Sequence, residues 1–147
     1  MSTHKNITMT LLTLSDYEEF VRLLNEFRDT NLSYEEFADI LHQINETGNT
    51  FVYVLREKER GPIIGTAKLL IENKFYHDGK NVGHIEDVIV KSTHQGKKYG
   101  SCLIKQLTDI ARVLNCYKVL LYCNTDLVPF YSKIGFDHNQ SAMINYI

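Results

Sequence analysis

The pattern of apolar and polar positions in the first third of the chain predicts one strand followed by two helices. Residues 7–12 are rich in apolar and β-branched side chains, which indicates a short strand. Apolar residues then recur at helical spacing over 17–27, after a Ser-x-x-Glu capping box at 15–18. The same spacing returns over 37–44, after a second box at 33–36. We therefore expect two amphipathic helices directly after the first strand.

The middle of the chain has the composition of β-strands. Residues 50–55 and 63–71 are rich in β-branched and aromatic side chains, and the Arg-Gly-Pro segment at 60–62 between them is typical of a turn. A polar loop at 72–81 leads to a further strand at 83–90. These segments predict a hairpin and a third strand beside it.

The last third of the chain predicts a helix, a strand, a short helix and a final strand. A turn with Gly and Lys at 95–100 precedes a helical apolar face over 103–114. The pattern then favours a buried strand at 117–122, a short helix at 125–134 and a last strand at 136–147. The resulting order, β-α-α-β-β-β-α-β-α-β, is that of an α/β protein with a mixed sheet and helices on its faces.

Length and composition fit a single domain over residues 1–147. The chain is 44% hydrophobic and 23% charged, and no repeat or linker divides it. Its formal charge of −2 lacks the basic excess that nucleic-acid binding usually needs. It has no leader-like N-terminal pattern and no segment near the roughly 20 apolar residues of a membrane span. We therefore expect a cytoplasmic protein that binds neither nucleic acid nor membrane.

The cysteines and histidines do not predict a metal site. Three cysteines without C-x-x-C spacing are expected to be free, buried and apolar in character: Cys102, Cys116 and Cys123. The histidines are scattered without ligand spacing: His4, His42, His77, His84, His94 and His138. We interpret each histidine as a surface or structural residue and expect no metal.

Two adjacent carboxylates, Glu86 and Asp87, interrupt the apolar strand predicted at 83–90. Burying an uncompensated charge is costly, so the pair is either solvated at the edge of the sheet or placed beside a ligand. Neighbours in a regular strand point to opposite faces, and only a bulge would let both carboxylates serve one pocket. These residues alone leave both interpretations open.

A turn that opens a helix follows this strand, and a tyrosine lies on a later short helix. The turn comprises Gln95, Gly96, Lys97, Lys98, Tyr99, Gly100 and Ser101. Free N–H groups at such a helix start bind phosphate oxygens, although the P-loop spacing is absent and a solvated basic turn explains the pattern equally well. Tyr131, within a Phe-Tyr-x-x-x-Gly-Phe segment at 130–136, is by itself more often a residue at the edge of a core than an acid.

Together these three segments resemble the GNAT superfamily of acetyl-CoA-dependent N-acetyltransferases. Three runs are similar to its glucosamine-6-phosphate N-acetyltransferase family: Gly-His-Ile-Glu-Asp-Val-Ile-Val at 83–90, Gln-Gly-Lys at 95–97 and Leu-Asn-Cys-Tyr-Lys-Val at 114–119. The resemblance follows the element order of the whole chain and is strongest from Lys74 to Phe136. It implies the GNAT acyl-CoA N-acyltransferase fold. It also implies acetyl transfer from acetyl-CoA to the 2-amino group of D-glucosamine 6-phosphate, in UDP-N-acetylglucosamine biosynthesis.

For acetyl-CoA, the resemblance implies a site along the strand and the turn. The pyrophosphate would lie on residues 95–101, and the pantetheine would pair with Val88, Ile89 and Val90. The N–H group near Val88 would polarise the thioester carbonyl. Tyr131 would protonate or hydrogen-bond the departing CoA thiolate, with Ser132 and Lys133 flanking the cofactor.

For the sugar phosphate, the resemblance implies a site shared by the two subunits of a homodimer. Glu86 and Asp87 would position the amine, with Val88 beside them, and the amine must lose a proton before it attacks. The remaining contacts would come from the loop before the acidic strand and, in the partner subunit, from the strand that follows the long helix: Lys74 and His77, then Tyr117 and Lys118.

Departures from the family, among them Arg28 and Tyr122, leave the details of the site open. Arg28 stands where the family tends to have a small hydroxyl residue, and it offers an alternative phosphate contact. Tyr122 stands where the family often has an acidic residue. Two other functions also stay open: acetylation of a different amine, and a non-catalytic CoA-binding module whose acidic pair is merely solvated.

Overall fold

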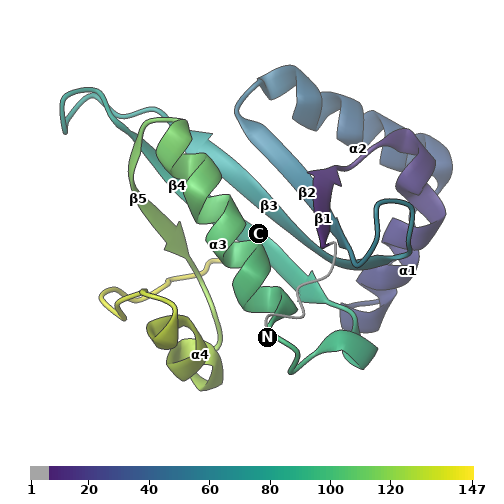
Figure 1. Ribbon diagram of the computed structural model, residues 1–147. Helices are drawn as coiled ribbons and strands as arrows, with labels where there is room; N and C mark the ends of the chain where they lie inside the picture. Colours follow the sequence, from purple (N-terminus) through teal and green to yellow (C-terminus); the bar gives the residue numbers. More distant parts are fainter. Residues whose placement is uncertain (1–6) are drawn as a thin grey trace.

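A five-stranded sheet forms the centre of the computed structural model, which describes residues 7–147 (Figure 1). The strands are β1 (Thr8–Leu11), β2 (Thr50–Arg56), β3 (Ile63–Glu72), β4 (Asn81–Val90) and β5 (Cys116–Leu121). The helices are α1 (Tyr17–Phe27), α2 (Tyr34–Thr47), α3 (Tyr99–Val113) and α4 (Val128–Lys133). None of the helices in this part of the chain is long and apolar enough to cross a membrane.

The sheet is mixed, as the sequence predicts. The strand order is β1-β2-β3-β4-β5, in which the first four strands pair antiparallel and β5 runs parallel to β4. The parallel pair requires a crossover connection, which α3 provides. In Figure 1, α3 lies across one face of the sheet and α4 lies beside β5.

Helices bury both faces of the sheet. The core on the α3 side consists of Ala67, Leu69, Ile71, Ile85, Leu103, Ile104, Leu107 and Ala111, together with Tyr131 of α4. The core beneath α1 and α2 consists of Leu12, Leu23, Phe37, Leu41, Val54, Ile63 and Ile89. Burying such a side chain stabilises the fold by about 1.5–3 kcal/mol. The strands that carry the candidate site are therefore held from both sides.

The capping predictions are confirmed for α2 and wrong for α1. Before α2, the Glu36 N–H donates to Ser33 Oγ at 3.2 Å, and the Ser33 N–H donates to Glu36 Oε2 at 2.8 Å. The box predicted to begin at Ser15 does not form. Instead, the Thr13 N–H donates to Asp16 Oδ2 at 2.9 Å, because a 3₁₀ turn comes before the helix.

The prediction of a strand at 136–147 is also wrong for the single chain that the structure describes. The residues after 135 form no strand, and every side chain from 137 onward is exposed, including Met143 and Tyr146. A strand needs hydrogen-bonded neighbours, and the structure places no other strand of the described chain beside this segment. The apolar composition predicts a tendency to form a strand but not the partner that would satisfy it.

Candidate active site

A β-bulge in β4 carries the two adjacent carboxylates. The register between β3 and β4 shifts so that Thr66 pairs with Ile89, whereas Lys68 pairs with Glu86. Asp87, inside this shift, has a φ of +53°, a conformation that Asp and Asn adopt more readily than other residues with side chains. The bulge that would let Glu86 and Asp87 serve one pocket is therefore present in β4.

Lys68 of β3 lies beside the acidic pair and forms an ion pair with one of its members. It lies opposite Glu86 in register, and its Nζ lies 3.2 Å from Asp87 Oδ2. The Asp87 side chain is 70% exposed, so the pair is accessible to a ligand. Sequence reasoning missed Lys68. The signal was present, because this lysine interrupts the apolar run at 63–71 just as the acidic pair interrupts β4.

Strands β4 and β5 separate just before the acidic pair. Their pairing ends where Ile85 meets Leu121, although β4 continues to Val90. Backbone groups on the β5 side of residues 86–90 therefore have no partner strand there, and an extended ligand can pair with such an edge as an added strand. Three residues predicted to contact the pantetheine lie on this edge: Val88, Ile89 and Val90.

The predicted phosphate turn leads into a helix without a side-chain cap. Gly96 and Lys98 have φ values of +77° and +67°, and α3 then begins at Tyr99 with no side chain accepting from its first N–H groups. Such N–H groups, at the positive end of the helix dipole, are an anion-binding arrangement. The turn therefore presents backbone N–H groups of the kind that bind phosphate oxygens.

A groove of about 1040 Å³ runs between α3, β5 and α4. Residues of the turn and of α4 line it together: Lys98, Ser101, Tyr131 and Ser132. All three cysteines also line it, and all are free and half-buried, so the prediction that they are buried is wrong. They lie on the surfaces of α3, β5 and the following loop that face the groove, where Cys116 and Cys123 pack against the edge of the α3-side core.

Tyr131 is fixed in the wall of this groove with a phenol that resists ionisation. Its side chain is 8% exposed, and its ring meets those of Phe130 and Phe136 edge-on at centroid distances of 5.0 and 5.8 Å. Burial raises the pKa of Tyr131, and nearby Cys123 raises it further. A phenol that stays protonated in a fixed orientation can donate a proton or a hydrogen bond to a ligand in the groove.

The predicted sugar-phosphate residues form a second cluster, from the β3–β4 loop and β5. The His77 ring stacks on Tyr117 with centroids 3.9 Å apart, and Lys118 Nζ lies 5.4 Å from the Tyr117 centroid. Lys74 forms an ion pair with Glu72, whose hydrogen bond raises the pKa of Lys74 and keeps it charged. We call Lys74, His77, Tyr117 and Lys118 the loop cluster.

Within one chain, the loop cluster and the acidic pair lie towards opposite ends of β4. Lys118 pairs with Val82, which is four residues from Glu86 and so about 13 Å along the strand. Arg28 belongs to neither group: it follows the last residue of α1, and its guanidinium lies 5.6 Å from the centroid of the Phe27 ring. The structure thus brings His77, Tyr117 and Lys118 into contact with one another, but it joins neither Arg28 nor the carboxylates to them.

Four of the histidines contact other side chains, and one of them, His77, stacks on Tyr117. His42, His84 and His94 each lie within 3.1 Å of a glutamate oxygen. Within residues 7–147, no group of three or more His, Cys, Asp or Glu side chains could hold a metal ion. His4 lies outside the described residues.

Comparison with known proteins points to one family. The sequence model of the acetyltransferase (GNAT) family matches residues 16–136. Glucosamine 6-phosphate N-acetyltransferase of Trypanosoma brucei brucei is 34% identical over 138 residues, which cover 94% of each chain. The probable glucosamine 6-phosphate N-acetyltransferase of Drosophila melanogaster is 34% identical over 124 residues, but the match spans only 57% of that longer protein. The crystal structure of glucosamine-6-phosphate N-acetyltransferase from Arabidopsis thaliana superposes with a TM-score of 0.88, at 32% identity and with coverage of 96% and 98%.

Proposed function

Because the chain belongs to the acetyltransferase (GNAT) family, we propose that it transfers the acetyl group of acetyl-CoA to the 2-amino group of D-glucosamine 6-phosphate. The products are N-acetyl-D-glucosamine 6-phosphate and CoA. The observation that carries the proposal is the bulge in β4, with the acidic pair at an open strand edge directly before an anion-binding turn. In the cytoplasm, the product would enter the route to UDP-N-acetylglucosamine.

On the cofactor side, main-chain groups do most of the binding. Residues 95–101 hold the pyrophosphate through N–H groups at the start of α3, and residues 88–90 pair with the pantetheine along the free edge of β4. Ser132 and Lys133 flank the cofactor from α4. The size of the groove and its lining by residues of both the turn and α4 support this placement.

The chemistry requires a free amine and a protonated leaving group. Glu86 and Asp87 hold the substrate ammonium and take its proton, directly or through water, so that the nitrogen can attack the acetyl carbon. The Val88 N–H stabilises the oxyanion, a contact of a kind whose loss typically lowers kcat by about 10²–10³. As the carbon–sulfur bond breaks, Tyr131 gives a proton to the CoA sulfur.

We assign the loop cluster to the active site of a second copy of the chain. Its separation from the acidic pair along β4 argues against a single-chain sugar-phosphate site. The β5 strand is the edge of the sheet, and the exposed segment 137–147 carries large apolar side chains of the kind that mark association surfaces: Met143, Ile144, Tyr146 and Ile147. In this homodimer His77 is donated together with Tyr117 and Lys118, because it stacks on Tyr117, whereas the sequence predicts that only the two β5 residues come from the partner.

Product analysis tests this proposal. Incubation with acetyl-CoA and glucosamine 6-phosphate is expected to give the acetylated sugar phosphate and CoA in equal amounts, measured by mass spectrometry. Glu86→Gln and Tyr131→Phe are expected to slow the reaction without abolishing CoA binding. Unchanged transfer in both variants would remove the assigned roles, and CoA binding without transfer to any amine would support the non-catalytic alternative.

A further inference from the structure

The carboxylate of Glu57, just after β2, reaches both ends of the phosphate-binding turn. Glu57 Oε1 lies 2.5 Å from His94 Nε2, and Glu57 is also near enough to Tyr99 that, besides burial, its charge and a side-chain hydrogen bond raise the pKa of that phenol. His94 immediately precedes residues 95–98 and Tyr99 immediately follows them. A side chain far away in the sequence therefore ties together the two ends of the turn.

The two side chains that Glu57 contacts are themselves fixed. His94 Nδ1 lies 2.8 Å from Thr93 Oγ1, so both ring nitrogens have a partner. The His94 ring meets the Tyr99 ring at a centroid distance of 5.7 Å. Burial raises the pKa of the Tyr99 phenol, and the charge and hydrogen bond of Glu57 add to this effect. We call Glu57, His94 and Tyr99 the Glu57 cluster.

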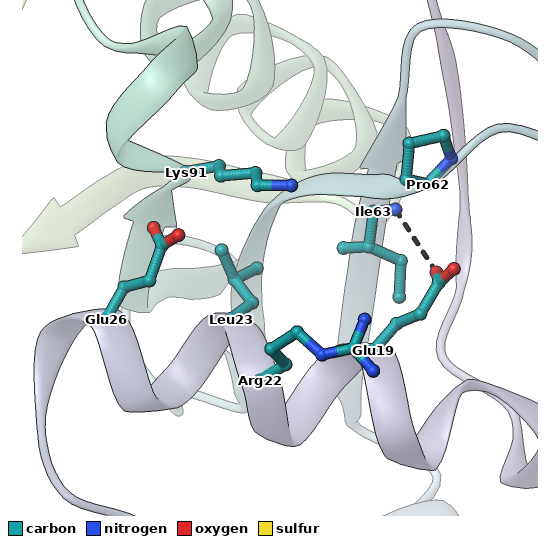
Figure 2. Close-up of a pocket in the computed structure, with 7 residues that line it drawn as sticks. All are labelled: Glu19, Arg22, Leu23, Glu26, Pro62, Ile63 and Lys91. Carbon is teal, nitrogen blue, oxygen red and sulfur yellow. Dashed lines mark hydrogen bonds between the residues drawn. The ribbon is translucent and has the colours of Figure 1, made fainter.

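A second carboxylate holds the entry to the turn from the opposite side. Glu26 of α1 accepts a hydrogen bond from the Ser92 N–H at 2.9 Å, at the start of the 3₁₀ turn that leads to His94. Figure 2 shows Glu26 extending from α1 towards the end of β4, beside Lys91. The turn is thus anchored at its entry by α1 and at both ends by the β2–β3 connection.

If Glu57 acted through its charge alone, it would weaken CoA binding, whereas its contacts with the turn indicate that it strengthens CoA binding. A carboxylate near a phosphate site repels the ligand, so a merely neighbouring Glu57 would weaken CoA binding, and its removal would strengthen it. A carboxylate that holds the turn in shape strengthens binding instead, because the N–H groups need not reorganise when the phosphate arrives. The sign of the effect therefore separates the two roles.

We propose that Glu57 is a positioning residue for acetyl-CoA, which holds residues 95–98 in their phosphate-binding conformation through His94 and Tyr99. This inference rests on the acetyl-CoA site of the proposed function. It adds a residue that touches neither substrate nor cofactor and acts only through the turn.

The test compares Glu57→Ala with Glu59→Ala, a matched control in the same connection whose exposed carboxylate has no contact with the turn. The dissociation constant for CoA is measured by calorimetry, and KM and kcat are measured for both substrates. Glu57→Ala is expected to weaken CoA binding about tenfold, the effect of losing a charged hydrogen bond. The control is expected to bind CoA like the wild type, and Glu57→Gln, which keeps an acceptor oxygen for Tyr99, is expected to lie in between.

The outcomes distinguish this inference from the proposed function. A rise in KM for acetyl-CoA, with KM for the amine and kcat nearly unchanged, supports the positioning role. Equal or tighter CoA binding by Glu57→Ala overturns it while leaving the proposed function intact. A wild-type protein that binds no CoA overturns both. Since the Glu57 side chain is 44% exposed, the variant is expected to fold, which thermal unfolding checks.

Discussion

Asp87 contributes both a backbone conformation and a carboxylate to the bulge in β4. Its φ of +53° favours Asp or Asn, whereas a β-branched residue there costs about 1–2 kcal/mol. We expect Asp87→Asn to keep the free energy of unfolding nearly unchanged and to lower kcat. Asp87→Val is expected to lower kcat and to reduce the free energy of unfolding by about 1–2 kcal/mol. Denaturant unfolding and steady-state kinetics on the same samples measure both effects.

Two results would contradict this account of Asp87. Equal unfolding free energies for the Asn and Val variants would mean that the left-handed conformation imposes no cost. Full activity in Asp87→Asn would mean that the carboxylate has no part in the reaction.

Single residues could be predicted from the sequence where a charge breaks an apolar pattern. Glu86 and Asp87 were identified in this way, and Lys68 carries the same signal. That all three share one site could not be predicted, because it depends on a register shift between β3 and β4, and neither strand alone specifies its register.

At the scale of the element, the turn before α3 depends on the positive φ of Gly96. We expect Gly96→Ala to raise KM for acetyl-CoA, because an added Cβ strains the conformation that presents the N–H groups. Gly48, after α2, is the matched control: its φ of +69° is close to the +77° of Gly96, and an added Cβ would contact nothing within 4 Å at either position. Both variants are expected to lose about 1 kcal/mol of unfolding free energy.

The control makes this comparison decisive. Denaturant unfolding measures the shared cost, and initial rates over a range of acetyl-CoA concentrations measure the difference. If Gly48→Ala raises KM for acetyl-CoA as much as Gly96→Ala does, general destabilisation explains the result and the turn has no special role.

Most elements could be predicted because their signals are local. The helical spacing, the Ser33 capping box and the turn at 60–62 each lie within one segment, and α2 and the β2–β3 hairpin form as predicted. The strand at 136–147 could not be judged in this way, because a strand also requires a neighbour, and none lies beside it in the described chain.

At the scale of the whole molecule, the account requires sites composed from two chains. Glu86→Gln and Lys118→Ala, each alone, are expected to be poorly active. When the two variants are co-expressed, mixed dimers contain one site with both residues intact, so activity is expected to recover to about a quarter of the wild-type level. Activity assays on the purified mixture measure the recovery, and light scattering checks that the protein is dimeric.

The mixed dimer also shows what to expect if each active site belongs to a single chain. If each site is built from one chain, both variants damage every site that they occupy, and co-expression restores nothing. Monomeric wild-type protein with full activity would likewise rule out the shared site.

The net charge of −2 is compatible with two anionic ligands because their contacts are local. The turn before α3 offers N–H groups with Lys97 and Lys98, and the loop cluster brings two lysines and a histidine together. Overall charge predicts only that the chain does not bind nucleic acid, and it could not reveal these local groups of hydrogen-bond donors, which depend on the fold.

The proposed acceptor is tested by comparing kcat/KM for glucosamine 6-phosphate, glucosamine, a polyamine and a lysine peptide, with CoA thiol release as the readout. We expect glucosamine 6-phosphate to be the preferred acceptor. Glucosamine should be slower by about 100-fold, because the groups that bind the phosphate would be left without a partner. Turnover of the polyamine or the peptide, with none of glucosamine 6-phosphate, would contradict the account.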